Sequence, residues 1–123
     1  MKSDTRKSII ERRGYRKNIK GDKFSLYISS YPVAIEYLRK RIGDKHKILA
    51  ELCCGIGITL ETAGGAFKHI IGVDNDKKTL TYCKDNLKSS GLLSKSTLIL
   101  GDINEDSVLG KIKADIVIYD IPF

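Results

Sequence analysis

From residue 48 onward, short apolar runs alternate with helical patterns along the chain. Four runs rich in Ile, Val or Leu predict strands that are buried on both faces, as in a parallel sheet. The predicted strands are Ile48–Leu52, His69–Val73, Thr97–Leu100 and Asp115–Tyr119. Because strands that alternate with helices are typical of βαβ units, the pattern predicts an α/β, Rossmann-like fold.

The clearest helical pattern lies between the second and third strands. Asp76 can cap this helix, Leu80, Cys83 and Leu87 fall on one stripe, and Gly91 can end it in a left-handed conformation. Other helices are predicted from Pro32 to about Arg41, after the first strand as far as Gly64 and Gly65, and around Glu105 to Leu109.

Positive charge is concentrated at the start of the chain. Residues 1–47 hold 14 Lys/Arg and 5 Asp/Glu, whereas residues 48–123 hold 8 and 10. Residues 2–23 carry nine of these cations and show no apolar period that would bury them. The pattern predicts a mobile basic arm over residues 1–23 and a core over residues 24–123. The arm is either a segment that contacts nucleic-acid phosphates or a solvated tail, and charge alone favours neither.

Length and composition exclude several classes of protein. A chain of 123 residues with 41% apolar and 30% charged residues is typical of one globular domain. No apolar run approaches the roughly 18 residues of a membrane span, and no signal-type stretch follows Met1, so we expect a cytoplasmic protein without membrane contact. Three cysteines without CxxC spacing predict neither a disulfide framework nor a metal site, and His46 and His69 are interpreted as solvated.

Residues that could bind a ligand follow the ends of the predicted strands. A glycine-rich turn, with Gly55 and Gly57, joins the first strand to a helix, but Leu60 stands where a dinucleotide fingerprint needs a third glycine. Asp74 ends the second strand and Asp102 follows the third. Each feature alone could be a tight turn or a cap. Together they predict a ligand site, because parallel strands bring their carboxyl ends to one edge of the sheet.

The stretch from Ile48 to Phe123 resembles the cofactor-binding half of a class I S-adenosylmethionine-dependent methyltransferase. The residues from Glu51 to Gly57 resemble that family's first motif, D/E-x-x-x-G-x-G. The resemblance implies that S-adenosyl-L-methionine is the cofactor, that Glu51 faces its methionine end, and that backbone from Cys53 through Gly55 to Gly57 lies beneath it.

The same resemblance assigns the remaining cofactor contacts. It implies that Asp74 holds the ribose, that Asn75 lies near the adenine, and that Asp102 and Ile103 contact the adenine edge. Residues 21–32 resemble a segment that lies over the cofactor in trimethylguanosine synthase-like RNA methyltransferases. By that likeness, the cofactor or base pocket is lined by Tyr27, Ser29 and Tyr31.

The sequence Asp120-Ile121-Pro122-Phe123 resembles the D/N-P-P-Y/F motif of amino-group methyltransferases. The resemblance implies that the Asp120 side chain and the carbonyl of Asp120 or Ile121 accept hydrogen bonds from the target amine. Phe123 would stack on the target base. Ile121 departs from the pattern, which has proline there, so altered geometry rather than lost function is expected.

The resemblance implies a partial core with strand order 3-2-1-4, in which strand four is an apolar edge that a second chain, self-association or further strands of the core would cover. The leading hypothesis is methyl transfer to an exocyclic amine of a nucleic-acid base, with RNA guanine as the substrate. Two alternatives keep the catalytic chemistry and change the target to protein glutamine or DNA. Two others are a non-catalytic cofactor- or RNA-binding half of a split or truncated methyltransferase, and a nucleotide-binding module.

Overall fold

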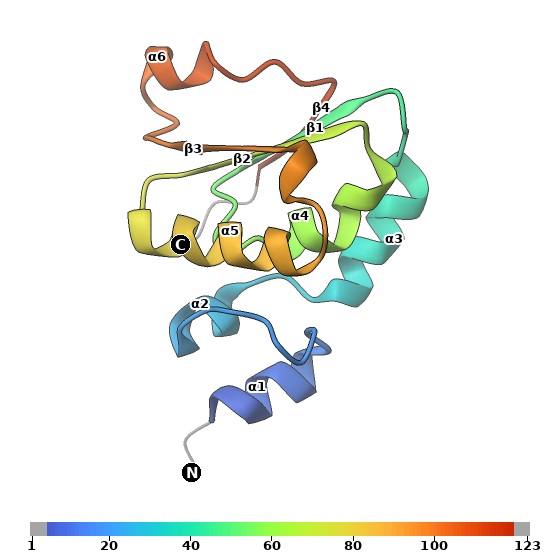
Figure 1. Ribbon diagram of the computed structural model, residues 1–123, viewed down its shortest axis with the longest axis vertical. Helices are drawn as coiled ribbons and strands as arrows, with labels where there is room; N and C mark the ends of the chain where they lie inside the picture. Colours follow the sequence, from blue (N-terminus) through green and yellow to red (C-terminus); the bar gives the residue numbers. More distant parts are fainter. Residues whose placement is uncertain (1–4, 120–123) are drawn as a thin grey trace.

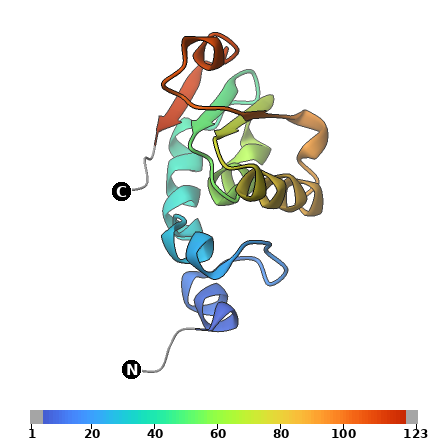
Figure 2. The same ribbon diagram turned by 90° about the vertical axis from the view of Figure 1, so that its left-hand side faces the viewer.

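The computed structural model describes residues 5–119 of the chain. A four-stranded sheet carries α3, α4 and α5 on one face and α6 on the other, and α1 and α2 lie beyond the first helical layer (Figures 1 and 2). The helices are α1 Arg6–Arg13, α2 Lys23–Ile28, α3 Pro32–Ile42, α4 Ile58–Ala63, α5 Lys77–Ser89 and α6 Asp106–Leu109, with short 3-10 turns η1 at Gly64–Ala66 and η2 at Leu93–Lys95. Within the described residues, no helix is long and apolar enough to cross a membrane.

The sheet confirms the predicted fold class. Its strands are β1 Ile48–Leu52, β2 His69–Asp74, β3 Ser96–Leu100 and β4 Ile116–Tyr119. They are parallel and ordered β3-β2-β1-β4. The predicted strand bounds differ from these by one residue at most.

Alternate residues of the central strands enter two different cores. Leu49 and Ile70 pack with residues of α3, α4 and α5, whereas Ala50, Ile71 and Val73 pack with α6. Successive side chains of a strand point to opposite faces, so a strand that is covered by helices on both faces is apolar at most of its positions. This explains why the Ile- and Val-rich runs predicted the strands so closely.

The predicted ends of α5 are also confirmed. Asp76 Oδ1 accepts the backbone N–H of Thr79 at 2.9 Å, which satisfies a donor at the start of the helix. Gly91 adopts a left-handed φ of 76°, and the N–H of Leu92 then donates to the Leu87 carbonyl at 2.8 Å. These contacts fix α5 beside β2, at the edge of the sheet where the acidic residues gather.

Residues 5–23 bury apolar side chains, although their sequence shows no apolar period. These residues form α1 and a following loop, and they contribute Ile9, Ile10, Tyr15 and Ile19 to a buried cluster with residues of α2 and the β1–α4 turn. The apolar residues come from a helix and an irregular loop, so their spacing follows neither the helical nor the strand period. The boundary at residue 23 remains a prediction.

Candidate functional site

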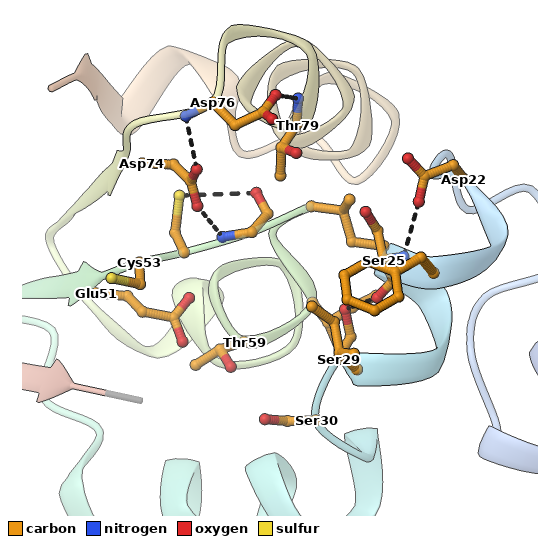
Figure 3. A pocket seen from close by; sticks show the side chains of 16 residues that line it. Asp22, Ser25, Ser29, Ser30, Glu51, Cys53, Thr59, Asp74, Asp76 and Thr79 are labelled. Atoms are coloured by element: carbon orange, nitrogen blue, oxygen red, sulfur yellow. Dashed lines mark hydrogen bonds between the residues drawn. The ribbon is translucent and has the colours of Figure 1, made fainter. Parts of the chain in front are cut away.

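A cavity of about 760 Å³ lies between the carboxyl ends of the central strands and α2 (Figure 3). This volume falls within the range of about 300–1,000 Å³ that is usual for small-molecule sites. Its walls come from the glycine-rich turn, the ends of β1 and β2, the start of α5, and α2 with the residues that follow it. The lining residues are Asp22, Phe24, Ser25, Ile28, Ser29, Ser30, Glu51, Cys53, Cys54, Gly55, Ile56, Ile58, Thr59, Asp74, Asp76 and Thr79.

The glycine-rich turn brings bare backbone to the floor of the cavity. Gly55 has a φ of 57°, and a Cβ atom placed there would meet nothing within 4 Å. Gly57 has a φ of 89°, and its Cβ would lie 2.8 Å from the Cys83 sulfur, so α5 packs against this turn through the missing side chain. The turn therefore needs glycine at both positions, for backbone conformation at each and for close packing at the second.

Asp74 is held at the rim by two backbone N–H groups. Its Oδ2 accepts the N–H of Gly55 at 2.9 Å, and its Oδ1 accepts the N–H of Asp76 at 3.0 Å. A carboxylate has about four lone-pair sites, so each oxygen can accept one more hydrogen bond. The side chain is therefore oriented by the protein and still able to receive two hydroxyl groups of a ligand.

Glu51 reaches the cavity from the end of β1 (Figure 3). Only 4% of this residue is exposed, although its neighbours across the sheet are Gly72 of β2 and Ile118 of β4. Burial of a carboxylate in such surroundings is costly unless charge or hydrogen bonding compensates for it. A cationic ligand in the cavity would be attracted to this carboxylate.

The charge of the lining points to one class of ligand. Four carboxylates line the cavity, those of Asp22, Glu51, Asp74 and Asp76, and its lining as described contains no Lys, Arg or His. The N–H of Ser25 donates to Asp22 Oδ1 at 2.7 Å, and this backbone hydrogen bond lowers the pKa of the Asp22 carboxyl. The cavity therefore favours a ligand with positive charge and disfavours one with phosphate groups.

One face of α2 forms the wall opposite the strands. Phe24 and Ile28, one helical turn apart, line the cavity, and they are 69% and 50% exposed. Ser29 also lines it, as predicted from the sequence. Tyr27 and Tyr31 do not belong to the lining. Instead, the ring of Tyr27 on α2 lies 5.2 Å from the guanidinium of Arg13, and the ring of Tyr31, which follows α2, lies 4.5 Å from it.

The cysteines of the turn differ in their surroundings. Cys53 is partly exposed at the cavity, in a left-handed conformation with a φ of 59°. Cys54 is buried, and a side-chain hydrogen bond with Cys83, together with burial, raises the pKa of its thiol well above the usual range. Cys54 is therefore a neutral packing residue at physiological pH. Within residues 5–119, no group of three or more His, Cys, Asp or Glu residues is arranged to hold a metal ion.

Besides Tyr27, four predicted cofactor residues lie outside the lining of the cavity: Gly57, Asn75, Asp102 and Ile103. Asn75 is exposed between Asp74 and Asp76. Asp102 follows β3 and uses its Oδ1 to accept the N–H of Asn104 at 2.8 Å. Ile103 is partly buried and packs with the core on the α6 face of the sheet. The structure thus brings Glu51, the glycine-rich turn and Asp74 together at the cavity, whereas Asp102 and Ile103, which follow the third strand, do not line it.

The predicted catalytic residues Asp120, Ile121, Pro122 and Phe123 lie outside the described residues. The residue before them, Tyr119, is the last residue of β4 and pairs with Leu52 of β1. The described chain therefore ends beside the strand from which Glu51 reaches the cavity.

Sequence reasoning missed most of the α2 wall. Asp22 accepts the N–H of Ser25, which is a helix-capping arrangement, so the spacing of these two residues was the available signal. A helix of six residues is too short to reveal by its sequence which side faces inward, so the prediction named Tyr27 and Tyr31 rather than Phe24 and Ile28.

Comparisons with known proteins agree with this geometry. The sequence profile of a family described as RNA cap guanine-N2 methyltransferase matches residues 46–123, more than half of the chain. A comparison with curated proteins gives no match. Among solved structures, a proposed RNA methyltransferase from Pyrococcus horikoshii is 26% identical with a TM-score of 0.67, and the match covers 98% of this chain and 60% of that one.

Two further solved structures share the fold at lower identity. A tRNA methyltransferase from M. jannaschii is 22% identical with a TM-score of 0.65, over 77% of this chain and 28% of that one. A precorrin-6y C5,15-methyltransferase from Geobacter metallireducens is 19% identical with a TM-score of 0.66, over 83% of this chain and 53% of that one. The chain thus spans about 60% of the length of the Pyrococcus horikoshii protein and less of the other two. With a parallel β3-β2-β1-β4 sheet, a glycine-rich turn after β1 and a family profile that matches all four strands, the chain has a class I S-adenosylmethionine-dependent methyltransferase fold and belongs to the RNA cap guanine-N2 methyltransferase family.

Proposed function

We propose that this chain binds S-adenosyl-L-methionine in the acidic cavity and forms the cofactor-binding part of an RNA methyltransferase that acts on the exocyclic amine of guanine. The observation that carries the proposal is the lining of the cavity, where four carboxylates and no cation surround a bare glycine turn. S-adenosyl-L-methionine carries positive charge on its sulfonium and its amino group, so its charge complements this lining.

The residues of the cavity fit the cofactor in three respects. The open space over Gly55 admits a ligand against the backbone, and the two remaining acceptor sites of Asp74 suit the paired hydroxyls of a ribose. Glu51, buried at the end of β1, is proposed to face the methionine end. Phe24 offers an exposed ring at the rim, on which a planar base can stack.

The cofactor, held by the glycine-rich turn, Glu51 and Asp74, would supply an activated methyl group on its sulfonium sulfur. The protein's part is to hold the amine in line with the methyl carbon, which is mainly a matter of proximity and alignment. We assign this part to the Asp120 side chain and the carbonyl of Asp120 or Ile121 as hydrogen-bond acceptors, and base stacking to Phe123.

RNA as the substrate is supported by the matching family and by charge. The family's description names guanine of an RNA cap, and the chain as a whole carries a formal net charge of +7. Lysines 7, 17, 20 and 23 of the N-terminal segment are exposed, so they remain available to phosphate groups. The acidic cavity and the basic exterior thus suit a cationic cofactor and an anionic substrate respectively.

A second candidate is a cofactor-binding half that needs further strands or a partner for catalysis. Within the described residues, β4 pairs only with β1, and Val117 and Tyr119 of β4 are each 52% exposed. Such an apolar edge is normally covered. By contrast, a nucleotide-binding module is disfavoured, because phosphates would lie among four carboxylates.

The experiment is a calorimetric titration with S-adenosylmethionine and S-adenosylhomocysteine, with ATP as the control ligand. We expect binding of the first two at micromolar concentrations and none of ATP; tighter binding of ATP would refute the cofactor assignment. Radiolabelled methyl transfer is then compared between capped RNA, uncapped RNA, DNA and protein. Transfer to capped RNA that is lost in Asp120→Ala supports the full proposal, whereas cofactor binding without transfer to any substrate supports the incomplete half.

A further inference from the structure

Asn86 of α5 is a fully buried amide that contacts two other segments of the chain. Its Oδ1 accepts the backbone N–H of Lys20 at 2.7 Å. Its Nδ2 donates to the Lys20 carbonyl at 2.9 Å and to the Ile56 carbonyl at 2.8 Å. The amide group thus makes three hydrogen bonds to backbone, although its residue is 0% exposed.

The two segments that Asn86 joins are opposite walls of the cavity. Lys20 lies two residues before Asp22, which caps α2 and lines the cavity. Ile56 lies between Gly55 and Gly57 in the glycine-rich turn, and it also lines the cavity. A single side chain therefore sets the spacing between the α2 wall and the turn beneath the cofactor.

Other contacts of the N-terminal segment act on the same wall. The Tyr15 hydroxyl lies 2.9 Å from the carbonyls of both Leu26 and Ser29, and Arg13 Nη1 donates to the Ser29 carbonyl at 2.9 Å. Arg16 forms an ion pair with Glu61 of α4 at 2.6 Å. The segment thus holds the carboxyl-terminal half of α2, and Asn86 links the residues just before α2 to the turn.

We propose that Asn86 is a positioning residue for cofactor binding, which fixes the α2 wall at the spacing that the cofactor needs. The proposal rests on the proposed function, because it assigns to Asn86 the geometry of that same cavity. Polar groups buried in a core are costly unless all their hydrogen bonds are made, and a leucine would fill this place without them. Three bonds to two cavity walls make spacing, rather than simple packing, the role of the amide.

The test compares Asn86→Leu and Asn86→Asp with Leu87→Ala. Asn86→Leu removes all three bonds, and Asn86→Asp keeps the acceptor for the Lys20 N–H but loses the donor to Lys20 and Ile56. Leu87→Ala is the matched control, because Leu87 is also 0% exposed and adjacent on α5, yet it packs in the core under the sheet and not with the N-terminal segment. All variants are measured at a temperature where circular dichroism shows them folded.

We expect the Kd for S-adenosylhomocysteine to rise about tenfold in both Asn86 variants, because both lose the Nδ2 bonds to Lys20 and Ile56, and less than about twofold in Leu87→Ala. Hydrogen exchange without ligand should accelerate at Lys20 in Asn86→Leu and at the amides of α2 in both variants, but not in Leu87→Ala. Equal affinity loss in all three variants, or unchanged exchange of α2 in the Asn86 variants, would overturn the positioning role. Because exchange needs no ligand, it still decides the role of Asn86 if the wild-type protein fails to bind the cofactor, a result that would refute the proposed function instead.

Discussion

Replacing Asp74 by asparagine tests how the rim of the cavity recognises a ribose. The carboxylate accepts one backbone N–H on each oxygen, from Gly55 at 2.9 Å and from Asp76 at 3.0 Å. An asparagine has one acceptor oxygen, so either orientation of its amide turns an NH₂ group toward one of these N–H donors. The substitution therefore keeps the size of the side chain and removes its charge and one of its acceptors.

The magnitude follows from the bonds that are lost. A hydrogen bond to a charged group contributes about 1.5–3 kcal/mol, so the loss of one backbone bond should lower the free energy of unfolding by about 2 kcal/mol. The same loss toward a ribose hydroxyl should weaken S-adenosylhomocysteine binding by about 2 kcal/mol, which is about 30-fold in Kd. Urea unfolding measures the first quantity, and calorimetric titration measures the second.

Asp76→Asn is the matched control for this experiment. Asp76 also lines the cavity, so its replacement removes the same charge from the same lining. Asparagine caps a helix about as well as aspartate, so the bond to the Thr79 N–H and the stability of α5 should be kept. We expect less than about a threefold change in Kd. If both variants weaken binding equally, the loss of affinity comes from the removed negative charge and not from a specific contact. If Asp74→Asn binds within about twofold of wild type, the ribose contact is refuted.

Three further predictions follow from the N-terminal segment and the turn. Replacing Lys7, Lys17 and Lys20 together by glutamine should reduce the slope of log K against log salt for RNA by about 2–3 if these lysines contact phosphates, and an unchanged slope would exclude those contacts. Tyr15→Phe should lower the free energy of unfolding by about 1–2 kcal/mol in urea, because the carbonyls of α2 lose a buried donor; an unchanged value would mean that water replaces it. The raised pKa of Cys54 predicts that stability is full below about pH 8.5 and falls as the pH rises further, since the unfolded thiol ionises first. If the urea midpoint of Cys54→Ala falls between pH 8 and 10 as much as that of the wild-type protein, ionisation of Cys54 is not the cause of the fall.

The sheet could be predicted from the sequence because each strand is buried on both faces. Runs of four to six residues rich in Ile, Val and Leu, separated by helical patterns, admit few other interpretations, and the acidic residue at the end of β2 marked the cavity edge. Gly55 and Gly57 were equally informative, because their left-handed φ values leave few alternatives to glycine.

The α2 wall and its anchor could not be predicted in the same way. Tyr27 and Tyr31 resembled pocket residues, but their rings lie against Arg13, and the side of α2 that carries Phe24 faces the cavity. The register of a six-residue helix is set by contacts made elsewhere, here by the Tyr15 hydroxyl and by the Arg13 guanidinium. The buried cluster of the N-terminal segment could not be predicted either, because its isoleucines follow no regular period among the charged residues.

The arginines of that segment have structural roles that charge alone could not reveal. Arg6 donates to the carbonyls of Ile19 and Gly21, and Arg16 pairs with Glu61, so both guanidinium groups serve the fold. Guanidinium groups suit such roles because their planar donors match carbonyls and carboxylates. The lysines of the segment are left as the candidates for phosphate contact.

A crystal structure of the protein with S-adenosylhomocysteine would test the assignment of the acidic cavity most directly. We predict a nucleoside whose ribose hydroxyls lie within hydrogen-bond distance of Asp74, whose amino acid end lies beside Glu51, and whose base lies against the α2 wall at Phe24. A ligand bound elsewhere, or bound with its ribose away from Asp74, would contradict the assignment.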